Sequence, residues 1–198
     1  MKFTVVMADP AGNRTAIVRS GVPKSERAKV AAAIMADPAL RAEQVGFETR
    51  PLYGKSLGRL EMAGEEAEEL YPLVVSRGIT HMICVDKEFD EAFARRMIDK
   101  FGKAYSAFGV MFVNGDSLIP VVYVAETDTV CCESSCGSGS LAAAWYLTRD
   151  EKDGFHGYNF EQPGGTITVN MAKRQGRYAG TVGGKLTLEE PVTMEIED

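Results

Sequence analysis

The hydrophobic pattern of the chain consists mainly of short strand-like runs. Apolar segments of four to eight residues that are rich in β-branched side chains and bounded by turn residues are typical of strands. We therefore expect strands at residues 3–8, 15–20, 45–53, 55–63, 80–86, 105–114, 118–127, 165–172, 176–182 and 185–197.

Two segments have the spacing of amphipathic helices. Residues 24–37 follow Pro23, are rich in alanine and place Val30 and Ile34 on one face. Residues 88–102 place an apolar side chain at every fourth position. Such spacing predicts a helix with one buried face.

A third, shorter helix is expected at residues 65–75, with Pro72 bending or ending it. The order of strands, one side helix, strands and a further helix then occurs twice along the chain. We therefore predict an α+β fold of two related halves, residues 1–75 and residues 76–198.

Composition narrows the classes of partner. The chain has 198 residues and a net charge of −6, which argues against nucleic acid as a ligand, because phosphates are neutralised by Lys and Arg. No apolar run reaches the roughly 20 residues that span a bilayer, and Asp9 and Pro10 interrupt the apolar N-terminus. We expect a cytoplasmic protein with reduced cysteines, no membrane contact and no metal or cofactor.

The most informative segment is "TVCCESSCGSGSLAAAWYL", residues 129–147. We expect a strand ending near Val130, a tight turn at residues 137–140 and a helix over residues 141–147. The first amides of a helix lack internal partners and carry partial positive charge, so they suit a carboxylate or phosphate. The same field is expected to lower the pKa of the Cys136 thiol.

A thiolate beside a carboxylate site suits the removal of the α-proton of a carboxylic acid. A racemase also needs a second acid or base on the opposite face of the substrate. Other interpretations of the cysteines stay open: Cys84 as a small core side chain, Cys131 and Cys132 as peripheral, a metal site, or a redox pair of Cys132 and Cys136. His81 is expected to be a hydrogen-bonded core residue.

The residues around Cys136 resemble the second active-site motif of the diaminopimelate epimerase family. Further likenesses lie in residues 8–18, which contain a Gly-Asn pair, in "GITHMICVD" and in "QPGGTITV". Residues 122–140 resemble most the branch of cofactor-independent racemases that includes histidine racemases. The resemblance implies two pseudo-symmetric halves, each with strands round a central helix, and a small amino acid bound between two helix N-termini.

The resemblance also implies roles for individual residues. Cys136 would be one acid/base, Asn13 would contact the substrate, and Glu133 is a weaker candidate for binding its ammonium group. The α-carboxylate would be held by four consecutive residues, Gly137, Ser138, Gly139 and Ser140.

The first half departs from the family pattern. It is shorter than in the family, and no cysteine precedes Cys84, although the family has a second catalytic thiol in its first half. Depending on the register, that position falls on Glu68 or Leu70, beside an acidic cluster of Glu65, Glu66, Glu68 and Glu69. Three interpretations stay open. The acidic cluster is only a solvated face of a helix, or Glu68 within it replaces the missing thiol as acid/base, or another chain supplies that thiol.

We therefore predict a racemase, epimerase or isomerase that acts at the α-carbon of a small amino acid. A homo-oligomer or a complex with a related subunit is expected. The alternatives are a non-catalytic amino-acid-binding or regulatory protein, and one subunit of a hetero-oligomeric racemase. His156 and Tyr158 are expected in a loop, without an assigned role.

Overall fold

A computed structural model describes residues 1–19, 21–47, 59–63 and 71–196 of the chain, with the backbone alone for residues 59–63. Mixed sheets dominate these residues and helices are few, which agrees with an α+β class. The chain separates into two compact units, residues 1–54 with 185–198 and residues 55–184. The division into related halves at residues 75 and 76 is a different one and stays a prediction.

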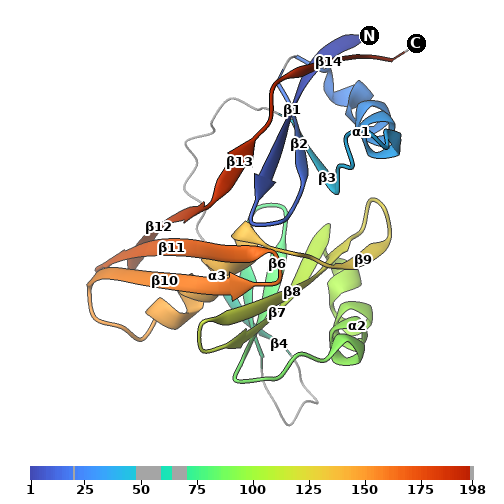
Figure 1. The fold of residues 1–198 in the computed structure, drawn as a ribbon. Helices are drawn as coiled ribbons and strands as arrows, with labels where there is room; N and C mark the ends of the chain where they lie inside the picture. The colour runs from blue at the N-terminus through green and yellow to red at the C-terminus, as the bar shows by residue number, and fades with distance from the viewer. Residues whose placement is uncertain (20, 48–58, 64–70, 197–198) are drawn as a thin grey trace. The chain divides into compact units, whose positions relative to one another are not determined.

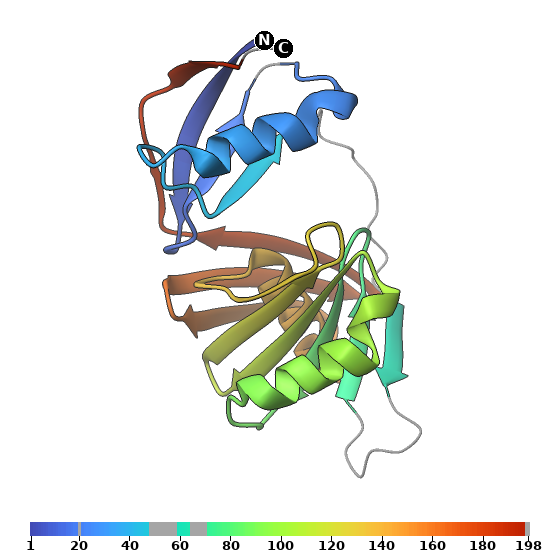
Figure 2. The ribbon, with the colours of Figure 1, turned by 90° about the vertical axis from the view of Figure 1, so that its right-hand side faces the viewer.

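The first unit is a five-stranded sheet with one α-helix against it (Figures 1 and 2). The strand order is β13-β1-β2-β3, and β14 also pairs with β1. Its elements are β1 (Lys2–Pro10), β2 (Thr15–Val18), η1 (Lys24–Glu26), α1 (Arg27–Ala36), β3 (Gln44–Phe47), β13 (Leu186–Leu188) and β14 (Val192–Glu195). The strands expected at both ends of the chain thus form one sheet.

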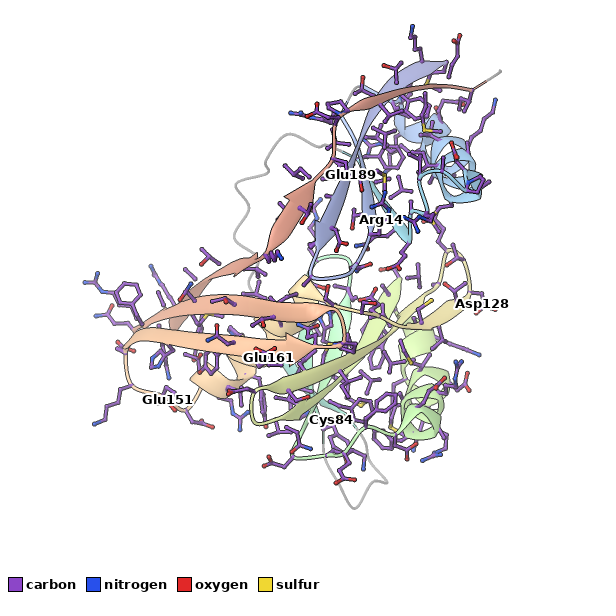
Figure 3. The ribbon with its side chains drawn as sticks, viewed as in Figure 1. Arg14, Cys84, Asp128, Glu151, Glu161 and Glu189 are labelled. Carbon is purple, nitrogen blue, oxygen red and sulfur yellow. The ribbon has the colours of Figure 1, made fainter. Side chains whose placement is uncertain are left out.

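The turn between β1 and β2 is anchored on two sides by Arg14. Its guanidinium makes a bidentate ion pair with Glu189, and its Nε donates to the Leu40 carbonyl at 2.8 Å. Arg14 and Glu189 point toward one another in Figure 3. The guanidinium lowers the pKa of the Glu189 carboxyl. This arrangement fixes the turn that contains Asn13, whose side chain is buried.

The second unit is a nine-stranded sheet with helices on both faces. The strand order is β12-β11-β10-β8-β7-β6-β5-β4, with β9 paired to β8. The strands are β4 (Arg59–Ala63), β5 (Tyr71–Val75), β6 (Thr80–Val85), β7 (Ala107–Asn114), β8 (Ser117–Val124), β9 (Thr129–Cys132), β10 (Gly154–Gln162), β11 (Gly165–Arg174) and β12 (Arg177–Gly184). The helices are α2 (Glu91–Lys100), η2 (Gly102–Ala104) and α3 (Gly137–Thr148).

The two faces of this sheet are separated by the alternation of side chains along β6 and β7. Cys84 and Phe112 pack in one core cluster with Ala94 and Ile98 of α2. The intervening residues point to the other face, where His81 contacts α3. Because both faces are covered, β6 is buried along nearly its whole length and appears in the sequence as a continuous apolar run. Cys84 is thus a core side chain, as expected.

Most expected strands and helices are present, and two expectations are wrong. Residues 71–75 form strand β5 and not the end of a helix, because Leu73 and Val74 are buried and pair with β6. Residues 64–70 before them, which contain the acidic cluster with Glu68, lie outside the described residues. His156 and Tyr158 lie in β10, which pairs with β11 along its full length, and not in a loop.

The turn expected at residues 137–140 is the first turn of α3 itself, which begins at Gly137. Similarly, α2 begins at Glu91 because the Asp90 side chain accepts a hydrogen bond from the Phe93 amide and caps the helix. None of the helices in the described ranges is long and apolar enough to cross a membrane.

Candidate active site

The site is centred on Cys136, which is the N-cap residue of α3. Its backbone is extended (φ −136°, ψ 102°), and its carbonyl accepts the Ser140 amide at 2.9 Å. Its Sγ accepts the Gly139 amide at 3.4 Å, in the position that a capping oxygen usually takes. The thiol is therefore held against the positive end of the helix, as the sequence indicated, and its residue is 6% exposed.

Two further amides at this helix end have no acceptor within the helix. The first amides of an α-helix have no acceptor within the helix. Here Sγ takes the Gly139 amide, which leaves the amides of Gly137 and Ser138. Ser138 is exposed and Gly137 is half-buried, so this end of α3 reaches the surface of its unit. Ser140 is fully buried, and its hydroxyl donates to the Cys136 carbonyl at 2.8 Å.

A chain of hydrogen-bonding groups leads from the thiol into the core. The Cys136 Sγ lies 3.5 Å from the Ser138 hydroxyl, which lies 3.3 Å from Nε2 of His81. The imidazole fits beside β7 because Gly109 faces it. A Cβ at Gly109 would lie 2.8 Å from the ring.

His81 is completely buried, and its Nδ1 has no hydrogen-bond partner among the described residues. Burial lowers the pKa of the imidazole to about 4. The ring is therefore neutral at pH 7 and does not form an imidazolium–thiolate pair with Cys136. It acts as a hydrogen-bond partner of Ser138 in the core, which agrees with the expected character of this histidine.

The protonation state of the thiol differs from the expectation. Burial is the largest effect, and together with the nearby Glu133 carboxyl it raises the pKa of Cys136 to about 12. The helix amides and the Ser138 hydroxyl act in the opposite direction but are weaker. The expected lowering towards neutrality is therefore wrong for this structure, and the group is a protonated thiol at pH 7.

Glu133 lies directly before the site, where β9 has ended. Its amide donates to the Pro120 carbonyl at 3.1 Å, and its carboxyl group lies near enough to the Cys136 thiol for each to shift the pKa of the other. Burial raises the pKa of this carboxyl, and the thiol contact partly offsets the rise. An acidic group thus lies beside the thiol, where a substrate ammonium group would also find a partner.

The structure brings together six of the residues that the sequence indicated, Glu133, Cys136, Gly137, Ser138, Gly139 and Ser140. Asn13 lies in the first unit, and Glu68 lies outside the described residues. Cys131 and Cys132 are exposed on β9. Among the described residues, no three His, Cys, Asp or Glu side chains are grouped to hold a metal ion.

Sequence reasoning missed Gln162, which lies at the end of β10 and is 8% exposed. Its Oε1 accepts the Cys136 amide at 2.8 Å, and its Nε2 donates to the Ser140 hydroxyl at 2.7 Å. The sequence signal was the segment "QPGG", whose glutamine precedes the noted Pro-Gly-Gly by one residue.

Comparison with models of known protein families identifies the family of this chain. The model of the histidine racemase CntK N-terminal domain matches residues 2–69 and 67–193. The chain belongs to this family. A histidine racemase of Fusobacterium nucleatum is 40% identical over 84 residues, which are 39% of this chain and 32% of the relative. One of Staphylococcus aureus is 28% identical over 100 residues, 49% of this chain and 36% of the relative.

The matched part of the chain covers about a third of the length of these curated histidine racemases. Among solved structures, a hydroxyproline epimerase from Agrobacterium vitis with bound trans-4-hydroxy-L-proline has a TM-score of 0.58. It is 11% identical, and the match covers 100% of this chain and 93% of that one.

A putative phenazine biosynthesis PhzC/PhzF protein from Clostridium difficile has a TM-score of 0.50 and 11% identity, over 98% and 100% of the two chains. At such identities these likenesses concern the fold, which is that of the hydroxyproline epimerase and PhzF proteins.

Proposed function

We propose that the chain is a cofactor-independent amino-acid racemase or epimerase in which Cys136 exchanges a proton with the substrate α-carbon. The observation that supports this most directly is the Cys136 thiol on the Gly139 amide, beside two further amides at the same helix end. Histidine is the first substrate to test, because the curated relatives are histidine racemases. The proposed fold is the diaminopimelate epimerase variant with a shortened first half.

In this proposal the substrate carboxylate accepts hydrogen bonds from the Gly137 and Ser138 amides. A base on the far face removes the α-proton, and the electron pair of the C–H bond moves into the carboxylate, which the helix amides stabilise. The Cys136 thiol, which is protonated at pH 7, then donates its proton to the α-carbon from the near face. The thiolate that remains is stabilised by the Gly139 amide and the Ser138 hydroxyl.

Among the described residues around the thiol, none is assigned as the group on the far face. Glu68 stays the proposed second acid/base within this chain, and a thiol from another subunit is the alternative source. We further propose that the protein is cytoplasmic and works as a homo-oligomer or with a related subunit. Neither proposal changes the role assigned to Cys136.

A second candidate function is amino-acid binding without turnover. Two observations favour it: the thiol is protonated at pH 7, and the sequence has no cysteine before Cys84. Such a protein would hold the carboxylate at the same amides and the ammonium group at Glu133. It would regulate or complete a full-length relative.

Exchange of the α-proton in deuterated water distinguishes the two functions. Loss of the α-proton signal of L- and D-histidine, and of a panel of other amino acids, is followed by proton NMR. We expect exchange of both enantiomers with wild-type protein and with the control Cys132→Ser, whose thiol is exposed on β9. Cys136→Ala should lose exchange of the enantiomer whose α-proton faces the thiol, because the base on the far face can still exchange the other one. If wild type shows no exchange while wild type and Cys136→Ala both bind the amino acid, the racemase proposal is wrong and binding remains.

A further inference from the structure

Gln162 connects strand β10 to the N-terminus of α3. Its side chain is 8% exposed and uses both ends of its amide, accepting from the Cys136 N–H at 2.8 Å and donating to the Ser140 hydroxyl at 2.7 Å. The Ser140 hydroxyl in turn donates to the Cys136 carbonyl at 2.8 Å. One side chain therefore holds the Cys136 amide directly, and through the Ser140 hydroxyl it also reaches the Cys136 carbonyl, which accepts the Ser140 amide as well.

The direction of the thiol depends on this backbone. With φ at −136° and ψ at 102°, the Cys136 Sγ lies 3.4 Å from the Gly139 nitrogen. A buried amide without an acceptor is unfavourable, so loss of the Gln162 oxygen would drive the Cys136 peptide to another orientation. The thiol and the neighbouring peptide groups would turn with it.

We propose that Gln162 is a positioning residue of this site. It keeps the Cys136 thiol on the Gly139 amide and leaves the Gly137 and Ser138 amides facing outward for a carboxylate. The inference rests on the proposed function only for the identity of that carboxylate. The position of the thiol is a property of the free protein and can be tested without any substrate.

The Gly139 amide signal reports where the thiol lies. The sequence contains two Ser-Gly steps, Ser20-Gly21 and Ser138-Gly139. Protein labelled with ¹³C′-serine and ¹⁵N-glycine therefore gives two selected signals, and Gly21 in the first unit is an internal reference. In the otherwise wild-type protein, Cys136→Ala removes the sulfur that accepts the Gly139 amide, so the Gly139 signal should shift strongly.

In a Gln162→Leu background the same Cys136→Ala change should shift Gly139 far less, because the thiol has already left the amide. Thr148→Val is the matched control. It removes the buried hydroxyl that bonds the Ala144 carbonyl at the other end of α3, so it perturbs the same helix but should leave the full Gly139 shift.

An undiminished Gly139 shift in Gln162→Leu would overturn the proposal. If Gln162→Leu does not fold, Ser140→Ala removes the second branch of the same network and should also reduce the shift relative to Thr148→Val. Equal shifts in Ser140→Ala and Thr148→Val would then refute it.

Turnover gives a second and separate readout. If the proposed function holds, Gln162→Leu should reduce the rate constant for histidine α-proton exchange by about tenfold, as expected for misplacing one hydrogen-bonded group. Thr148→Val should keep the wild-type rate. The two readouts can disagree. If wild type does not exchange the α-proton while Gln162→Leu still reduces the Gly139 shift caused by Cys136→Ala, the racemase function is refuted and the role of Gln162 stands.

Discussion

Gly139 is the residue of α3 where a single added methyl group should do the most damage. A Cβ at this position would lie 2.2 Å from Sδ of Met111 and 3.2 Å from Sγ of Cys136. Met111 is fully buried in β7, and its sulfur is followed by a methyl group that also lies within 3.3 Å of the added Cβ. The thioether must therefore move as a whole, in a core without room for it.

The expected cost of Gly139→Ala follows from two opposing effects. Overpacking a buried site costs about 1–3 kcal/mol, whereas alanine in place of glycine stabilises a helix by up to about 1 kcal/mol. We expect a net loss of about 1–2 kcal/mol in the free energy of unfolding. Gly137→Ala is the matched control, since its Cβ would meet only Val182 at an ordinary 3.6 Å. It should be neutral or slightly stabilising.

Urea unfolding followed by tryptophan fluorescence measures this difference. Trp145 is the only tryptophan of the sequence and lies on α3, so its signal reports on the second unit. The decisive variant is Met111→Ala, which removes the clashing atoms. In that background Gly139→Ala should become neutral or stabilising, because the new methyl fills some of the cavity. An equal loss in both backgrounds would refute the packing argument.

Three further predictions concern charge and protonation. Lys173 donates to three carbonyls at the C-terminal end of α3, at 3.4, 2.5 and 2.6 Å. Lys173→Met should therefore lower the free energy of unfolding by about 1–3 kcal/mol in urea titrations, whereas Arg174→Met, at an exposed position, should not. The pKa of His81 is about 4 when folded and 6.5 when unfolded, so the unfolded chain binds more protons within that range. Stability should fall as the pH falls from 6.5 to 4, by up to about 3 kcal/mol, and His81→Gln should remove this component of the pH dependence; an unchanged slope would contradict it. Glu133→Gln removes a group that raises the pKa of Cys136. Iodoacetamide should therefore alkylate Cys136 faster at pH 8, measured in a background in which the exposed Cys131 and Cys132 are replaced by serine. An unchanged or slower alkylation rate would contradict this prediction.

The sequence predicted the elements whose apolar residues are buried by their own strand or helix. The continuous run of β6 and the periodicity of α2 are of this kind. Strand β6 buries side chains on both faces of the sheet, and α2 buries one face in the core cluster that it shares with β6. Strand β10 was missed because its side chains alternate between half-buried and exposed, and only Phe160 and Gln162 are buried. Its stability comes from pairing with β11 along nine residues, which no local pattern shows.

The site was predicted as far as its residues are neighbours in the chain. The position of Cys136 at the start of a helix follows from the glycines and the alanine-rich run behind it. Gln162 was not found because it is 26 residues away and reaches the site only through the fold. The pKa of the thiol was misjudged because the sequence shows the helix end but not the depth of burial, and burial is the larger effect.

The high pKa of Cys136 limits what its proposed partner can be. A donor with a pKa of about 12 and a carboxylic acid such as Glu68, ordinarily near 4.3, differ in proton affinity by roughly 10 kcal/mol, which is too large for a reaction that runs in both directions. The gap must therefore shrink when substrate binds. A substrate ammonium group beside Glu133 would contribute to this, since it neutralises the charge that raises the pKa of the thiol next after burial. Binding of the ammonium group and activation of the acid would then be one event, and a ligand with a carboxylate but no ammonium group would not lower the pKa of the Cys136 thiol.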